Sequence, residues 1–201
     1  ATRAGIGLLE VLIAISLVSI LSVGMLMALQ MGLRTMEKVD ARLYDNRRVI
    51  AVNRIIDSQI AGLIPVAAHC TGGGDGMGPK IAFFQGEAMA MRFVSSYSMQ
   101  DASRGYPQLL EYTVIRNEHG AFRIVVNEHF YAPQLGLGML CLGMQPNPLM
   151  PDAGPVPRFM PIRVGPASFV LADKLQRVRF LYREALPDPP YERWHVQWPK
   201  H

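Results

Sequence analysis

The feature that most constrains this chain is a stretch without any charged side chain, Val11–Leu33. Extended back to Ile6, the apolar run is 28 residues long and carries one charge, Glu10. A transmembrane helix needs about 20 predominantly apolar residues. The run therefore predicts a membrane-spanning helix over residues 6–33. It is too long for a secretory signal peptide, whose apolar core has about 7 to 15 residues.

The remainder of the chain has the composition of a globular domain. Half of the 201 residues are hydrophobic and 18% are charged, against about 25% charged in an ordinary soluble domain. The uncharged stretch explains most of that deficit. Residues 65–201 have the length of one common domain, which excludes two large ones. The net charge of +4 is spread along the chain rather than gathered in a patch, which argues against a nucleic-acid partner.

Glu10 does not fit a simple membrane anchor. A charged carboxylate costs about 2 to 3 kcal/mol at the centre of a lipid-embedded helix, so such a residue is functional by default. The alternative is a position at the level of the lipid headgroups, where the dipole at the start of a helix favours a negative charge. Position alone leaves both interpretations open.

The residues around Glu10 carry a further pattern. Arg3-Ala4-Gly5 precedes the apolar residues Ile6–Leu9 and Glu10. This arrangement resembles the class III signal of type IV pilins and type II secretion pseudopilins. The resemblance implies that residues 1–5 are a partial leader, that a prepilin peptidase cuts between Gly5 and Ile6, and that Ile6 is then N-methylated. It also implies that Glu10 directs filament assembly.

A physical reason supports that role for Glu10. In a bundle of laterally packed helices, its carboxylate could lie beside the positive amino terminus of a neighbour, so that each neutralises the other. Counting basic residues gives the opposite topology, because Arg3 precedes the span and five basic residues follow it. The resemblance nevertheless implies a cytoplasmic leader, one pass through the bacterial inner membrane and a periplasmic domain.

The helix is predicted to continue beyond the span as an amphipathic helix over residues 34–64. Apolar residues recur there at spacings of three and four, which is typical of one helical face. The helix should end near Gly62 and Pro65, with its apolar stripe packed on the C-terminal domain. The stripe consists of Met36, Val39, Leu43, Val49, Val52, Ile56, Ile60 and Leu63.

Residues 65–201 are predicted to be rich in β-structure. Apolar residues alternate in Ala88–Val94 and Leu110–Val114, which indicates strands. Asn117–Gly120 is predicted to turn the second of these into a hairpin with Ala121–Asn127. Arg177–Arg183 and Trp194–Trp198 also alternate and should each have one buried and one exposed face. The expected fold class is α+β, with a long N-terminal helix packed on a β-rich domain, as in pilins.

Prolines and cysteines give two more expectations. Seven prolines lie between residues 146 and 166, which predicts a long irregular surface segment. Cys70 and Cys141 fit neither a CxxC pair nor a zinc framework. If both lie in an oxidising compartment, one disulfide between them is possible.

Motifs of enzymes and cofactor sites are missing. The glycine-rich segment Thr71–Lys80 lacks the GxxxxGK[ST] spacing of a phosphate loop, because Pro79 separates Gly78 from Lys80. His69 beside Cys70 has no second ligand pair to complete a metal site. No nucleophile lies in a catalytic motif, and no acidic spacing matches an EF-hand. We therefore expect a protein without enzymatic activity, cofactor or metal.

The C-terminal part is similar, in the order of its segments, to the J-type minor pseudopilin. The segments are Met91–Ser95, Leu110–Val114, Phe180–Tyr182 and Trp194–Pro199. The resemblance implies a structural subunit at or near the tip of the type II secretion pseudopilus. Its implied partners are I-type and K-type minor pseudopilins, the major pseudopilin and the prepilin peptidase. Two alternatives remain, a minor pilin of a type IV or DNA-uptake pilus and a membrane-tethered periplasmic enzyme or binding protein.

Overall fold

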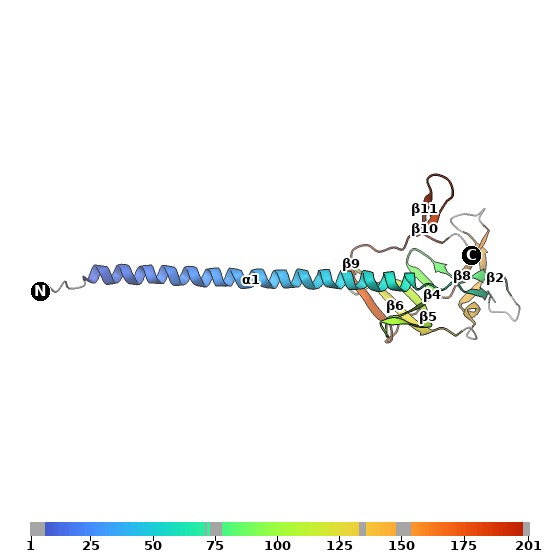
Figure 1. Cartoon of the computed structure of the whole chain (residues 1–201), viewed down its shortest axis with the longest axis horizontal. Coiled ribbons are helices and arrows are strands. Elements are labelled where there is room, and N and C mark those ends of the chain that lie inside the picture. Colours follow the sequence, from blue (N-terminus) through green and yellow to red (C-terminus); the bar gives the residue numbers. More distant parts are fainter. Residues whose placement is uncertain (1–6, 71, 73–77, 133–135, 148–153, 199–201) are drawn as a thin grey trace. The chain divides into compact units, whose positions relative to one another are not determined.

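The computed structural model of the protein describes residues 7–70, 72, 78–132, 136–147 and 154–198. The chain divides into two compact units, Ala1–Ala51 and Val52–His201. Figure 1 shows the order of the elements, which begins with one helix and continues with strands. The architecture is α+β, as the sequence predicts.

The first element is the helix α1, Leu8–Ala61, which has 54 residues. It continues well beyond the uncharged stretch, as predicted, and Gly24 and Gly32 lie within it. Its segment Leu8–Met36 is 29 residues long and apolar enough to cross a membrane. The helix ends where Gly62 donates its N–H to Ser58 O at 3.0 Å, and Pro65 cannot continue it.

The main sheet is antiparallel and has five strands in the order β3-β4-β5-β6-β9. The predicted strands and hairpin are present in it. The hairpin joins β5 to β6 through Asn117–Gly120, where Gly120 has φ +78°, a conformation that glycine adopts without strain. The strands are β3 Gln85–Gly86, β4 Ala90–Ser98, β5 Ser103–Arg116, β6 Phe122–Phe130 and β9 Phe169–Leu175.

Three further sheets have two antiparallel strands each. The first pairs β1 Ala67–His69 with β2 Lys80–Ala82. The second pairs β7 Cys141–Pro146 with β8 Pro155–Phe159, and the short 3-10 helix η1, Leu137–Leu140, precedes it. The third is the hairpin of β10 Tyr182–Ala185 and β11 Glu192–His195.

Both faces of the main sheet are covered, because alternate residues of β4 and β5 enter two different cores. Phe93 and Leu110 belong to the helix-side core, which also includes Val52, Ile55 and Ile56 of α1. Val94 and Leu109 belong to the disulfide-side core, with both cysteines. The sheet is thus the middle layer of Val52–His201. Of the predicted apolar stripe, Val52 and Ile56 pack as expected. The other six members are exposed: Met36, Val39, Leu43, Val49, Ile60 and Leu63.

Both lateral edges of the main sheet are interrupted. Along β4, the outer edge is occupied at one end by β3. At the other end, Ile64 N–H donates to Val94 O and Ser96 N–H donates to Gly62 O, both at 2.8 Å. On the opposite edge, the register of β9 against β6 shifts twice, and Lys174 near its end has φ +60°.

The expectation that the proline-rich segment has no regular structure is wrong. Residues 141–146 and 155–159 form the β7–β8 hairpin, and Val156 and Phe159 are buried in it. A two-stranded ladder consists of edge strands only, and edge strands tolerate a residue without an N–H. Pro146 faces Pro155, and Pro157 faces Met144, without ending the ladder.

Two predictions for the C-terminal segment are also corrected. Residues 177–181 do not form a strand, which begins only at Tyr182. In Trp194–Trp198, β11 ends at His195, and the predicted apolar face is buried only in part, because Trp198 packs against the helix-side core. Trp194 is 57% exposed and Val196 39% exposed, whereas His195 is half-buried. Trp194 points outward because it lies on the opposite face of the hairpin from Tyr182, which pairs with His195 and enters the helix-side core.

Candidate functional site

The first candidate site is the start of α1. Glu10 lies in the first turn of the helix, where its N–H donates to Gly7 O at 2.9 Å. Its side chain is exposed, in the middle of a helix surface formed otherwise by Leu9, Ile13 and Leu17. A single carboxylate therefore projects from the apolar first part of α1. Gly5 and Ile6, the predicted cleavage and methylation residues, lie outside the described residues.

The end of α1 is attached to the sheet through a buried polar contact. Ser95 Oγ donates to Gln59 O at 2.8 Å, and the Tyr112 hydroxyl donates to Gln59 Oε1. Gln59 is fully buried, and burial raises the pKa of Tyr112, so the phenol remains a neutral donor. A Cβ at Gly62 would come within 2.8 Å of Ser95 Oγ. A larger residue at this closest approach would force Ser95 or the end of α1 to shift.

A buried ionic network lies on the disulfide-side face of the sheet. Arg92 is only 1% exposed, and its Nε donates to Glu111 Oε1 at 2.7 Å. Its other nitrogens donate to Gln85 Oε1 at 2.6 Å and to Met160 O at 3.2 Å. Asn127 Nδ2 donates both to Glu111 Oε2 and to Arg163 O. The network holds the segment after β8 against β4, β5 and β6.

The electrostatics of the network favour an ionised Glu111. Burial alone raises the pKa of its carboxyl. The hydrogen bond from Asn127 and the charge and hydrogen bond of Arg92 act in the opposite direction, with a smaller contribution from the charge of His129. Together they hold the pKa of Glu111 below its ordinary value. The arrangement is that of a satisfied structural ion pair, since both partners are also hydrogen-bonded to neutral groups.

Sequence reasoning did not single out this network. Arg92 interrupts the alternating apolar run of β4, and such a residue normally marks a solvated face. A strand with charges on one face also fits an exposed sheet, so the pattern alone gives no signal for burial. Residues 160–168 cover Arg92 and its partners, and they lie more than 60 positions after Arg92 in the sequence.

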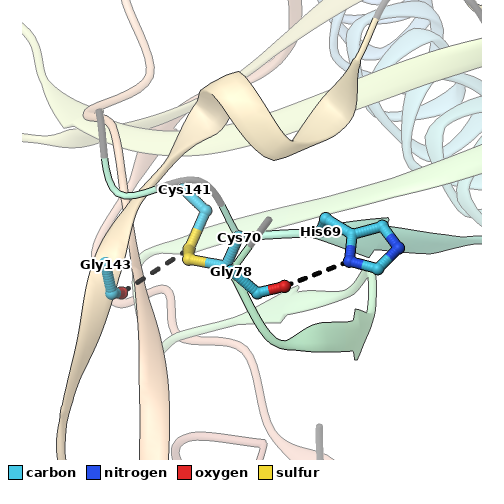
Figure 2. Close-up of a disulfide and its surroundings, with 5 residues drawn as sticks. All are labelled: His69, Cys70, Gly78, Cys141 and Gly143. Atoms are coloured by element: carbon cyan, nitrogen blue, oxygen red, sulfur yellow. Dashed lines mark hydrogen bonds between the residues drawn. A yellow bond between two sulfur atoms is a disulfide. The ribbon is translucent and has the colours of Figure 1, made fainter. Parts of the chain in front are cut away.

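Cys70 and Cys141, left open as a possible pair, are joined in a disulfide with 5.2 Å between their Cα atoms. Both are buried, at 3% and 1% exposure. Cys141 is the first residue of β7. Figure 2 shows Gly78 between the disulfide and the His69 ring, which faces Gly78 O. The distance from His69 Nδ1 to that oxygen is 3.0 Å. The His69 ring is therefore hydrogen-bonded to the backbone of Gly78.

An apolar groove of about 430 Å³ lies between the end of α1 and the C-terminal segment. Its walls include Leu63, Phe84, Leu181 and Trp198, and Arg183 is the single charged residue among those that line it. Arg183 continues onto the outward face of the β10–β11 hairpin, where it lies 3.4 Å from Glu192. Arg183 thus belongs both to the wall of the groove and to the outward face of the hairpin.

Among the described residues, no group of three His, Cys, Asp and Glu side chains could hold a metal ion. The two described histidine–carboxylate pairs are His195 with Glu184 at 2.8 Å and His129 with Glu111 at 3.4 Å. The Glu111 carboxylate also accepts hydrogen bonds from Arg92 and Asn127. The glycine-rich segment after Cys70 lies largely outside the described residues.

The geometry defines a protein with an N-terminal apolar helix and a β-rich C-terminal unit that contains a buried ion pair and a disulfide. No family model, curated protein or solved structure matches the chain.

Proposed function

We propose that the chain is a minor pseudopilin, a structural subunit at or near the tip of the type II secretion pseudopilus, most like the J type. The observation that carries the proposal is the position of Glu10. It is the only charge in an apolar run of 28 residues and stands five residues after Gly5. The run begins a helix that ends on an antiparallel sheet.

The chemistry of the helix supports an assembly role for Glu10. An exposed carboxylate among Leu9, Ile13 and Leu17 is costly in lipid unless a positive group lies beside it. In a filament, the methylated amino group of Ile6 on a neighbouring subunit would supply that charge. The prepilin peptidase would create this amino group by cutting after Gly5.

The proposal includes a location and partners. The span would cross the bacterial inner membrane once, with the β-rich unit in the periplasm, where oxidising conditions permit the Cys70–Cys141 bond. I-type and K-type minor pseudopilins and the major pseudopilin would bind the chain, and no enzymatic activity is assigned to it. Exposed helix residues such as Val39 and Leu43 offer apolar surface for these contacts.

The proposal is tested by substituting Glu10. Glu10→Ala should leave the fold unchanged, because the side chain is exposed. It should lower incorporation into filaments about tenfold or more. The amino group of the neighbouring subunit would lose its partner, and an unpaired charge in lipid costs about 2 to 3 kcal/mol. Ser16→Ala is the matched control, because Ser16 is exposed on the same span and its hydroxyl donates to Ile13 O at 2.8 Å within the helix.

The measurements are a crosslinking assay for filament incorporation and mass spectrometry of the native amino terminus. A chain that begins with N-methylated Ile6 and a defect confined to Glu10→Ala would support the proposal. An uncut leader in cells with active prepilin peptidase would contradict it. Unchanged incorporation of Glu10→Ala would instead support the alternative that Glu10 lies at the level of the lipid headgroups.

A further inference from the structure

We propose that the apolar groove between the end of α1 and the C-terminal segment binds the hydrocarbon chain of a single-chain carboxylate, and that Arg183 binds the carboxylate group. All the residues that line the groove lie within the unit Val52–His201. The inference does not rest on the proposed function, because it uses neither Glu10 nor the membrane span.

The groove has a buried part and an exposed rim. Met91 and Phe93 of β4 are buried and line the first, whereas Ile60 and Leu181 are exposed and belong to the rim. The Arg183 side chain is also exposed and lies at the rim. The volume of about 430 Å³ is near the lower end of the roughly 300 to 1,000 Å³ of small-ligand sites, which favours one chain over two. A chain whose apolar end enters the buried part would bring its head group to Arg183.

The aromatic wall of the groove is held in place by contacts within the domain. The Phe84 ring meets Tyr182 and Trp198 edge to face, with ring centroids 5.7 and 5.8 Å away. Trp198 N–H donates to Gly86 O at 2.8 Å, and a Cβ at Gly86 would come within 2.7 Å of Trp198 Cβ. The Tyr182 hydroxyl donates to Glu87 O at 2.9 Å. Because this wall is formed without a ligand, binding costs less conformational entropy.

The walls of the groove favour a hydrocarbon chain over a peptide segment. The backbone N–H groups of Ile64, Phe83 and Trp198 already donate to carbonyl oxygens of the domain, each at 2.8 Å. A peptide lying among these residues would bury its own N–H and C=O groups with few partners, which opposes binding. A hydrocarbon chain has no such groups, and burial of its apolar surface favours binding.

Arg183 supplies the charge that selects an anionic head group. It is the single charged residue among those that line the groove. Its partner Glu192 lies 3.4 Å away, and both side chains are exposed, so their pairing contributes little to stability. A ligand carboxylate can replace Glu192 and accept two parallel hydrogen bonds from the guanidinium. The ligand class is therefore a long-chain carboxylate, with its chain in the groove and its charge at Arg183.

The test measures binding to the full chain in lipid nanodiscs, because detergent would compete for an apolar groove. The probe is dodecanoate brominated at its last carbon, called bromododecanoate here, since bromine quenches tryptophan fluorescence on close contact. The chain has two tryptophans, so Trp194→Phe leaves Trp198, which lines the groove, as the single reporter. We expect bromododecanoate to quench Trp198 in a saturable manner.

Substitutions in the Trp194→Phe background separate the chain from the head group. Leu63→Phe places a larger side chain at the exposed rim and should abolish the saturable quenching; quenching that remains and does not saturate comes from probe in the bilayer. Arg183→Gln should weaken binding of bromododecanoate about tenfold or more. It should leave binding of the uncharged bromododecanol unchanged, which also shows that the groove is intact. Arg193→Gln is the matched control, because Arg193 is exposed on the same hairpin and does not line the groove.

Three results would overturn the proposal. The first is saturable quenching that persists in Leu63→Phe, because the chain would then bind elsewhere. The second is equal affinity of bromododecanoate for the chains with and without Arg183→Gln, because the head group would then not contact Arg183. The third is binding of an apolar acidic peptide at the groove without any quenching by bromododecanoate, which would assign the groove to a protein partner.

Discussion

Replacing Arg92 by methionine should destabilise the β-rich domain strongly. The substitution keeps much of the side-chain length but removes the charge and the donors to Glu111, Gln85 and Met160 O. Removing one partner of a buried ion pair costs about 3 to 5 kcal/mol, because the other charge stays buried without compensation. That is a large part of the 5 to 15 kcal/mol that stabilises a typical domain.

The pH dependence of this loss has a defined sign. In the wild-type protein, the lowered pKa of Glu111 gives stability that is present above the pKa of the unfolded chain and is lost on acidification. Without Arg92, burial opposes ionisation more strongly, and the pKa should rise above its unfolded value. The variant would then gain stability from protonated Glu111 at low pH and lose it as the pH rises. The difference between the two proteins should therefore be greatest near pH 7 and shrink below about pH 4.

The measurement is urea unfolding of the full chain in detergent, followed by tryptophan fluorescence, at several pH values. Trp198 is a suitable probe because it packs on Phe84 and Tyr182. The double variant Arg92→Met/Glu111→Gln removes both charges and should be more stable than Arg92→Met alone at pH 7. A loss under 1 kcal/mol, or one that grows on acidification, would refute the account of the network.

Two further predictions use the same unfolding assay. Gly62→Ala should cost about 1 to 3 kcal/mol, because its Cβ would come within 2.8 Å of the bonded Ser95 hydroxyl; a neutral effect would show that the end of α1 can shift. Tyr112→Phe should cost about 1 to 3 kcal/mol by leaving Gln59 Oε1 without its donor, and a stabilised variant would contradict that role.

Local patterns were sufficient to predict the elements whose residues contact near neighbours in sequence. The hydrophobic run predicted the helix, and alternation around Met91 and Tyr112 predicted strands that are present. The turn at Gly120 followed from glycine between two apolar runs. In each case the signal and its structural partner lie within one element or one hairpin, so no long-range information was needed.

The sequence predictions failed where contacts between distant segments determine burial or strand pairing. Pro155 and Pro157 suggested irregular structure, but a two-stranded hairpin has free edges that accept proline. Trp194 was expected to be buried by its alternation, yet Tyr182 on the paired strand determines which face turns inward. Arg92 gave no signal at all, because its burial depends on a segment that folds back from residue 160 onward.

The interrupted edges of the main sheet have a consequence for solubility. An unprotected edge strand presents free N–H and C=O groups on which another chain can add as a further strand. Here β3 and residues 62–64 occupy the outer side of β4, and the bulges and the left-handed Lys174 distort β9. Uncontrolled strand addition between copies, the first step toward amyloid-like stacking, is thereby disfavoured on both sides of the sheet. A domain held at high local density could remain dispersed for this reason.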